Sequence, residues 1–134
     1  MTRHTLYADG AARGNPGPAG SGAALITPEG EVIEVMRFLG HNTNNVAEYT
    51  ALIIGLEEAR RRGVDDLDVR MDSKLVVEQV SNRWKVRTPH ILPLQQRARE
   101  LLRLFRNVDI RHIPREQNGV ADELSNRAID ERPA

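Results

Sequence analysis

The segment "LYADGAARGNPGPAGSG" (residues 6–22) decides which fold the rest of the chain can form. A P-loop would need a Gly-Lys-Ser/Thr run before a helix, and a dinucleotide-binding loop would need Gly-x-Gly-x-x-Gly at a helix start. Here the glycines lead into "AALIT" (residues 23–27), which is typical of a strand, and the chain has no Gly-Lys pair. The segment is therefore expected to connect two strands as a hairpin, with Asp9 at the end of the first strand.

The pattern of apolar residues along the rest of the chain predicts both strands and helices. Strands are expected at residues 3–9, 21–28, 32–40, 66–72 and 108–114, and helices at residues 46–63, 73–82, 89–105 and 119–131. The clearest helix repeats apolar residues from Tyr49 to Ala59 at helical spacing and has Gly63 at its expected end. This order predicts an α/β fold with a five-stranded mixed sheet. Strands one to three are antiparallel, and helical crossovers make strands four and five parallel to strand one.

The composition limits the class of protein. A chain of 134 residues is expected to form one domain, here residues 1–130, with residues 131–134 as a tail or the start of a linker. The chain has no cysteine, which excludes disulfides, zinc–thiolate sites and thiol nucleophiles and fits a cytoplasmic location. No apolar run approaches the roughly 18 residues of a membrane span, so no membrane partner is expected.

The formal net charge of zero hides an uneven distribution of charge. Residues 83–115 contain nine Lys and Arg residues against Glu100 and Asp109, which leaves +7 in this third of the chain and −7 in the remainder. A basic third beside an acidic remainder fits a polyanionic ligand together with metal-binding carboxylates. A solvated helix face would give the same pattern, so charge alone does not decide between the two.

Four carboxylates are expected to meet at one edge of the predicted sheet. Asp9 and Asp72 end two parallel strands, and ligands usually bind where such strands end. Glu48 lies one turn before Leu52 on the apolar side of its helix, where an acid is costly unless a cation compensates it. Asp122 lies early in the last helix, just after the fifth strand. The set predicts a site for hard divalent ions, although each acid alone also fits a strand end or a helix N-terminus.

Four segments carry a resemblance to a known family: "YADGAARGNPGPAGSGAAL", "TNNVAEYTALIIGLEEA", "DVRMDSKLVVEQV" and "NGVADELSNRA". In order and spacing they resemble the signature segments of type 1 ribonuclease H, over about residues 5–130. The resemblance implies the ribonuclease H-like fold, with helices on both faces of the sheet. It also implies that Asp9, Glu48, Asp72 and Asp122 are catalytic acids that bind two Mg²⁺ ions, with Mn²⁺ as a substitute.

The same resemblance implies a substrate and the residues that contact it. The family hydrolyses the RNA strand of RNA·DNA hybrids and leaves 5′-phosphate and 3′-hydroxyl ends. The positions that match its substrate-binding residues are Gly10, Asn15, Thr43, Asn44, Asn45, Ser73, Trp84 and Lys85. Asn44 and Asn45 also fit a simple helix cap, and Trp84 also fits a core residue.

Two departures from the family pattern affect how substrate is handled. Many members have a histidine in the loop before the last acid, whereas "REQNGVA" (residues 115–121) has none, and Arg115 or Glu116 are the candidates to replace it. Longer members also have a basic protrusion after the Trp-Lys segment, which is missing here. Grip on the substrate is then left to Arg83, Lys85 and Arg87, with His90 as a further candidate, and we expect weaker and more salt-sensitive binding.

Other functions remain open at this point. Compact members of this kind are candidates for a side activity on double-stranded RNA, and some are joined to a second domain in a bifunctional chain. We expect a monomer. The competing classes are a DNA-cutting relative of the same fold, a reverse-transcriptase-associated domain and a non-catalytic binding domain. The asparagine set argues against the first, and the presence of all four acids argues against the last.

Overall fold

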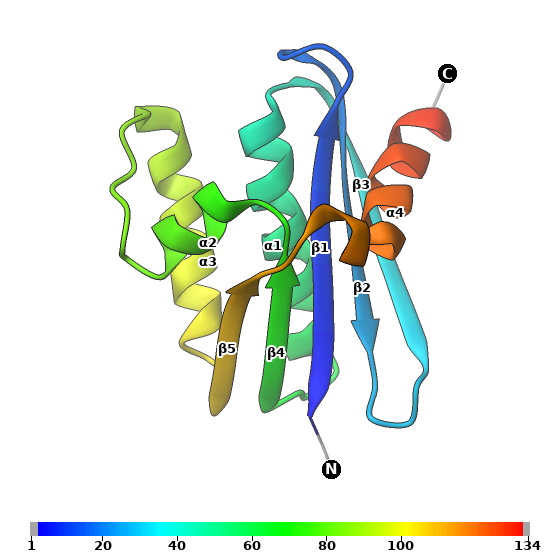
Figure 1. Cartoon of the computed structure of the whole chain (residues 1–134), viewed down its shortest axis with the longest axis vertical. Coiled ribbons are helices and arrows are strands. Elements are labelled where there is room, and N and C mark those ends of the chain that lie inside the picture. The colour runs from blue at the N-terminus through cyan, green and yellow to red at the C-terminus, as the bar shows by residue number, and fades with distance from the viewer. Residues whose placement is uncertain (1–2, 133–134) are drawn as a thin grey trace.

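The computed structural model describes residues 3–132, which form a five-stranded mixed sheet with helices packed on it (Figure 1). The strands are β1 (His4–Ala12), β2 (Gly17–Ile26), β3 (Val32–Asn42), β4 (Asp66–Met71) and β5 (Asn107–His112). Their order in the sheet is β3-β2-β1-β4-β5. β1, β2 and β3 pair antiparallel, while β4 pairs parallel with both β1 and β5. The predicted topology of the sheet is therefore confirmed.

The helices cover both faces of this sheet. They are α1 (Asn44–Arg61), α2 (Lys74–Val80), α3 (Leu92–Leu102) and α4 (Gly119–Asp130), with short 3-10 turns η1 (Pro89–Ile91) and η2 (Arg115–Gln117). A Cβ atom added to Gly55 of α1 would touch Ala23 of β2, whereas one added to Gly22 of β2 would touch Leu124 of α4. Because neighbouring residues of a strand point to opposite faces, α1 and α4 lie on opposite sides of the sheet.

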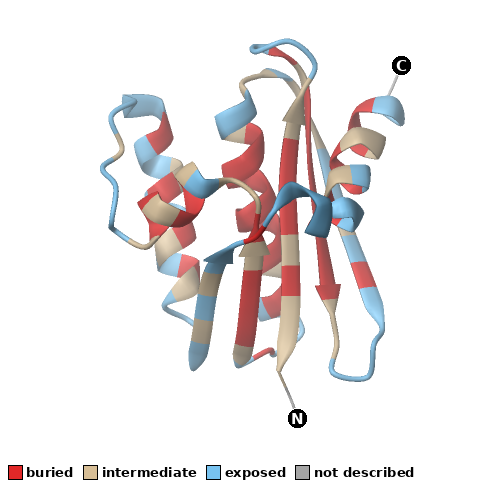
Figure 2. Ribbon diagram, viewed as in Figure 1, coloured by how far each residue is buried: buried red, intermediate tan, exposed pale blue. Residues whose placement is uncertain are grey.

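The core lies between α1 and the central strands (Figure 2). The repeat from Tyr49 to Ala59 that predicted the first helix forms its buried face. Leu67, Val69 and Met71 of β4 are fully buried, while β5 at the sheet edge is largely exposed. Burial of this apolar stripe fixes α1 against β1 and β2, and so fixes where the start of α1 lies relative to the strand ends.

Some boundaries differ from the expected ones, and the hairpin differs most. β1 continues three residues past Asp9, and β2 begins at Gly17 rather than at residue 21. The glycine-rich segment is therefore mostly strand, because Gly10 to Ala12 pair with the small residues of β2. Only residues 13–16 form the turn. The expectation that Asp9 ends the first strand is wrong, although the hairpin itself is confirmed.

The helix expected at residues 89–105 is also shorter than expected. It forms as η1 followed by α3, which ends at Leu102, and Phe105 is buried from the turn that follows. Glu131 and Arg132 of the expected tail follow α4, and residues 133–134 lie outside the described residues. Within residues 3–132, no helix has both the length and the apolar character that a membrane span requires.

Candidate active site

The parallel pairing of β1 and β4 places two of the four acids side by side. Ala8 of β1 is in register with Met71 of β4, so Asp9 and Asp72 are the next residues on neighbouring strands. β4 ends there, whereas β1 continues because it also pairs with β2. Asp9 thus lies within a strand, but at the level where the neighbouring strand ends. The predicted proximity of Asp9 and Asp72 is therefore present, although Asp9 does not end its own strand.

Glu48 reaches this pair from α1 through a close contact with Gly10. The Gly10 N–H donates to Oδ1 of Asp9 at 2.9 Å and to Oε1 of Glu48 at 2.6 Å. A Cβ atom at Gly10 would lie 2.2 Å from the carbonyl carbon of Ala47, so any other residue would push β1 and α1 apart. Gly10 therefore brings the two carboxylates together.

Three carboxylates form a tight and mostly buried cluster. Ligand oxygens of Asp9, Glu48 and Asp72 all lie within 4.8 Å of one another. Asp9 is 6% exposed and Glu48 is 7% exposed. Burial, followed by the hydrogen bond and charge of Glu48, raises the pKa of Asp9 to about 10. Burial also raises the pKa of Glu48, against the lowering effect of hydrogen bonds from Asp9, Gly10 and Ser73.

Asp122 lies farther from this cluster but lines the same cavity. This cavity, here called the acid cavity, has a volume of about 350 Å³. All four acids line it, together with Arg115, Asn126 and other residues. Asp122 stands in the first turn of α4, and Asn126 donates to its carbonyl oxygen at 3.0 Å. Its charge also contributes to the raised pKa of Asp9. The structure thus brings together all four acids that the sequence singles out, three of them tightly.

The donor set fits divalent ions of the Mg²⁺ type. Clustered carboxylate oxygens are the ligands that Mg²⁺ and Mn²⁺ prefer, and an uncompensated cluster of buried acids is costly. The raised pKa values of Asp9 and Glu48 express that cost, since burial and the neighbouring carboxylates disfavour the charged forms that a cation would stabilise. Asp9, Glu48, Asp72 and Asp122 are therefore the residues that would hold metal ions.

The polar residues before α1 lie at one side of this cavity. Asn15 in the hairpin turn accepts a hydrogen bond from the Asn44 N–H at 3.0 Å. Thr43 is the N-cap of α1, since its hydroxyl accepts from the Val46 N–H at 3.2 Å. The alternative that Asn44 and Asn45 cap this helix is therefore wrong. Both are exposed, and their side chains are free to contact a ligand.

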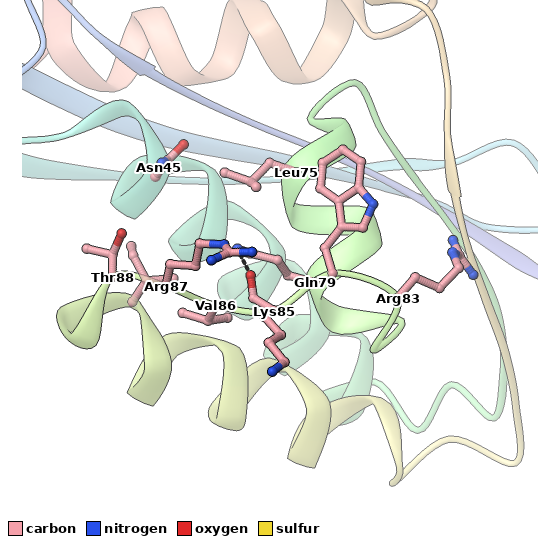
Figure 3. Close-up of a pocket in the computed structure, with 10 residues that line it drawn as sticks. Asn45, Leu75, Gln79, Arg83, Lys85, Val86, Arg87 and Thr88 are labelled. Atoms are coloured by element: carbon pink, nitrogen blue, oxygen red, sulfur yellow. Dashed lines mark hydrogen bonds between the residues drawn. The ribbon is translucent and has the colours of Figure 1, made fainter.

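A second cavity, here called the Trp84 cavity, has a volume of about 520 Å³, and Figure 3 draws the residues that line it. Its walls come from the start of α1, from α2 and from the loop that follows α2, where Asn45, Trp84 and Lys85 are among the lining residues. Gln79 holds this loop by donating to the Lys85 carbonyl oxygen at 3.2 Å. Trp84 is 43% exposed, and the Lys74 ammonium lies 5.9 Å from its ring centre. Trp84 is thus not a core residue.

The other residues expected to contact substrate differ in their surroundings. Ser73 caps α2, with its hydroxyl accepting from the Val76 N–H at 3.3 Å, and lies close enough to hydrogen-bond Glu48. Arg83 is paired with Glu78 through two hydrogen bonds of 2.8 and 2.9 Å, so its charge is largely balanced. Within residues 3–132, Lys85 and Arg87 have no such partner.

Sequence reasoning missed Arg13 and Asn126, which line the same cavity as the acids, and also Asn118. Asn118 is 1% exposed and donates to Asp72 Oδ1 and to the Ala8 carbonyl oxygen, both at 3.0 Å. An Asn four residues before Asp122 reads as an ordinary helix cap, so the sequence gives no signal of this contact. Arg115, one candidate for the missing histidine, does line the acid cavity.

Comparison with known proteins agrees with this geometry. A family model described as "Reverse transcriptase-like" matches residues 7–128. A bifunctional protein of Mycobacterium tuberculosis is 48% identical over 127 residues, which is 93% of this chain and 35% of that protein. A ribonuclease HI of Halobacterium salinarum is 45% identical over 126 residues, or 93% of this chain and 63% of that protein. The chain thus spans about a third of the first relative and less than two thirds of the second.

Solved structures give the same assignment. The N-terminal RNase H domain of the M. tuberculosis protein superposes with a TM-score of 0.92 at 45% identity, covering 98% of this chain and 96% of that one. RNase H1 of H. salinarum gives a TM-score of 0.91 at 45% identity, covering 96% and 98%. LC11-RNase H1 in complex with an RNA/DNA hybrid gives 0.88 at 42% identity, covering 96% and 97%. On its sequence, its fold and its acid cluster, the chain belongs to the type 1 ribonuclease H family.

Proposed function

We propose that this chain hydrolyses the RNA strand of RNA·DNA hybrids with the help of two divalent ions. The observation that carries the proposal is the cluster of Asp9, Glu48 and Asp72 within 4.8 Å, with Asp122 in the same cavity. The family relation supports it, and so does the solved hybrid complex of the related LC11-RNase H1. The products would be 5′-phosphate and 3′-hydroxyl ends.

The proposed reaction needs no nucleophilic side chain from the protein. Bound Mg²⁺ ions would supply the activation of the attacking water and the stabilisation of the leaving 3′ oxygen of the scissile phosphate. The residues of the chain supply the ligand oxygens, hold them at fixed positions and neutralise the ions. Gly10 holds the carboxylates of Asp9 and Glu48 close together by donating its N–H to both. Arg115 offers a positive charge at the cavity wall, next to where the phosphate would lie.

The start of α1 would lie between the RNA strand and the DNA strand of the proposed substrate. Asn44 lines the acid cavity, whereas its neighbour Asn45 lines the Trp84 cavity. A hybrid that places its RNA strand on the acids would therefore place its minor groove over Asn44 and Asn45. There the two amides can reach the 2′-hydroxyl groups and base edges that distinguish RNA from DNA.

The Trp84 cavity suits the DNA strand. An exposed indole ring offers a surface for stacking on sugar or base, and Lys85 and Arg87 beside it offer charge for phosphates. Few cations are free to bind the phosphates of the DNA strand here, because Arg83 is paired with Glu78. We therefore expect modest affinity for the hybrid, with a salt dependence that reflects only these few phosphate contacts.

The direct test is cleavage of end-labelled 20-mers with Mg²⁺ and then Mn²⁺, on RNA·DNA, RNA·RNA, DNA·DNA and single-stranded RNA. We expect cutting of the RNA strand of the hybrid that EDTA abolishes. Cutting of RNA·RNA as well would reveal a side activity on double-stranded RNA. Binding of the hybrid without cutting by either metal would contradict the proposal and favour a binding domain.

A further inference from the structure

Asn118 is buried at the start of α4 but does not act as a helix cap. An Asn at this position usually accepts a hydrogen bond from the N–H of the second or third helical residue. The Asn118 side chain makes no such bond, although its backbone has the N-cap position and it is only 1% exposed. Its amide is directed into the acid cluster instead.

One residue thereby touches all three elements that carry aspartates of the site. The Asn118 amide nitrogen donates to the carbonyl oxygen of Ala8, the residue before Asp9, at 3.0 Å. The same nitrogen donates to Oδ1 of Asp72 at 3.0 Å. The backbone carbonyl of Asn118 accepts from the N–H of Asp122 at 3.0 Å. Asn118 therefore links β1, the end of β4 and the first turn of α4.

The orientation of this amide is fixed by its neighbours. Both groups next to the nitrogen are acceptors, so a rotated amide would place its oxygen against the Ala8 carbonyl and the Asp72 carboxylate. In this orientation the Asn118 Oδ1 is buried without a hydrogen-bond partner among the described residues. An unpaired buried oxygen is destabilising, and capping α4 would avoid it. Stability of the fold alone does not account for the arrangement.

We propose that Asn118 is a positioning residue for the metal site. By occupying one oxygen of Asp72, it fixes the direction in which the other oxygen faces, and it ties Asp72 to the strand that carries Asp9. The proposal rests on the proposed function in one respect, namely that the acids bind divalent ions. Groups that orient metal ligands in this way typically change metal affinity or activity roughly 10- to 100-fold when removed.

The test compares two variants of Asn118 with one matched control. Asn118→Asp keeps the shape of the side chain but turns the donor into an oxygen that repels Asp72. Asn118→Ala removes both hydrogen bonds without adding a charge. Gln117→Glu adds the same charge one residue earlier, on an exposed side chain. Each protein is titrated with Mn²⁺ by calorimetry without substrate, and kcat and KM are then measured on the hybrid at one fixed metal concentration.

We expect both Asn118 variants to bind Mn²⁺ roughly 10- to 100-fold more weakly than the unmodified chain and to lose kcat, with KM for the hybrid within about twofold. Gln117→Glu should match the unmodified chain. Circular dichroism and thermal unfolding confirm folding, and if Asn118→Asp does not fold, Asn118→Ala carries the test. Unchanged Mn²⁺ affinity in the folded variants, or no Mn²⁺ binding by the unmodified chain, would overturn the proposal. Asn118-dependent Mn²⁺ binding without cleavage of the hybrid would contradict only the proposed function.

Discussion

Asp9 on β1 and Glu48 on α1 accept hydrogen bonds from one and the same backbone N–H, that of Gly10, at 2.9 and 2.6 Å. Two carboxylates that share one donor must lie close together, and both are more than nine-tenths buried. Without a cation, at least one of them keeps its proton at neutral pH, as the raised pKa of Asp9 indicates. The geometry that prepares the site for metal thus makes the metal-free protein less stable.

This relationship predicts how the stability of the metal-free protein depends on pH. Burial raises the pKa of Asp9 from its ordinary value of 3.8 to about 10 in the folded state. Between these values the folded state holds a proton that the unfolded state has released, so the free energy of unfolding falls as pH rises through this window. Asp9→Asn should flatten this dependence and raise the melting temperature at pH 8 by several degrees, since about 1 kcal/mol shifts it by roughly 4 °C.

Calorimetric melting in EDTA between pH 5 and pH 9 checks the effect of Asp9→Asn. Glu29→Gln serves as the control, because Glu29 is an exposed acid in the turn between β2 and β3. That variant should keep the pH dependence of the unmodified chain. Equal slopes for the Asp9 variant and the unmodified chain would mean that the acid cluster does not strain the fold.

Replacement of Asp72 separates metal binding from hybrid binding. Asp72→Asn keeps the shape of the side chain and removes the charge that a divalent ion requires. Cleavage of the hybrid should fall to background, while the dissociation constant for the hybrid in EDTA should stay within about threefold. End-labelled cleavage and fluorescence anisotropy measure the two quantities. Turnover near that of the unmodified chain would show that Asp72 is not a metal ligand.

The sheet topology could be predicted because its signals are local. Apolar alternation in "DLDVRMD" and helical spacing from Tyr49 to Ala59 each lie within one element, and helical crossovers then require parallel strands. The ends of the hairpin strands could not be predicted in the same way. Gly10 to Ala12 pair with residues 19–21, and this ladder depends on a partner strand and on small residues that fit between α1 and α4.

The acids of the site could be predicted for a similar reason, while Asn118 could not. Glu48 and Asp72 stand at recognisable places, on the apolar side of a helix and just after a strand, and the predicted topology brings both to Asp9. Asp9 itself lies within β1 and not at its end, but at the level where β4 ends. The role of Asn118 depends on two acceptors that lie 110 and 46 positions away in the chain. Local pattern indicates a helix cap there, and only the packed structure shows that the side chain turns away from the helix.

Asn45 is expected to contribute to the choice of hybrid over DNA duplex. Its side chain is exposed at the Trp84 cavity and takes no part in capping α1, which Thr43 does. Asn45→Ala should therefore leave the melting temperature nearly unchanged and reduce the ratio of hybrid to DNA-duplex affinity. Anisotropy titrations on both duplexes measure this ratio. Asn107→Ala, an exposed asparagine of β5, is the control, and an unchanged ratio in Asn45→Ala would exclude a role in reading RNA.

The salt dependence of hybrid binding should identify which cations contact phosphates. Each phosphate contact contributes about one to the slope of log affinity against log salt concentration. Lys85→Ala and Arg87→Ala should each lower the slope by roughly this amount, because both cations line the Trp84 cavity and have no ion-pair partner within residues 3–132. Arg83→Ala should lower it less, since Glu78 already balances Arg83.

Arg37→Ala is the matched control for these variants. Arg37 is an exposed cation on β3, at the opposite edge of the sheet from β5, and it lines neither the acid cavity nor the Trp84 cavity. Its removal changes the net charge by the same amount without touching the proposed DNA path, so its slope should equal that of the unmodified chain. Equal losses in Arg37→Ala and Lys85→Ala would mean that the total charge of the protein, and not the Trp84 cavity, governs binding. A loss confined to Lys85 and Arg87 would place the DNA phosphates there, because counterions are released only where a cation meets the backbone.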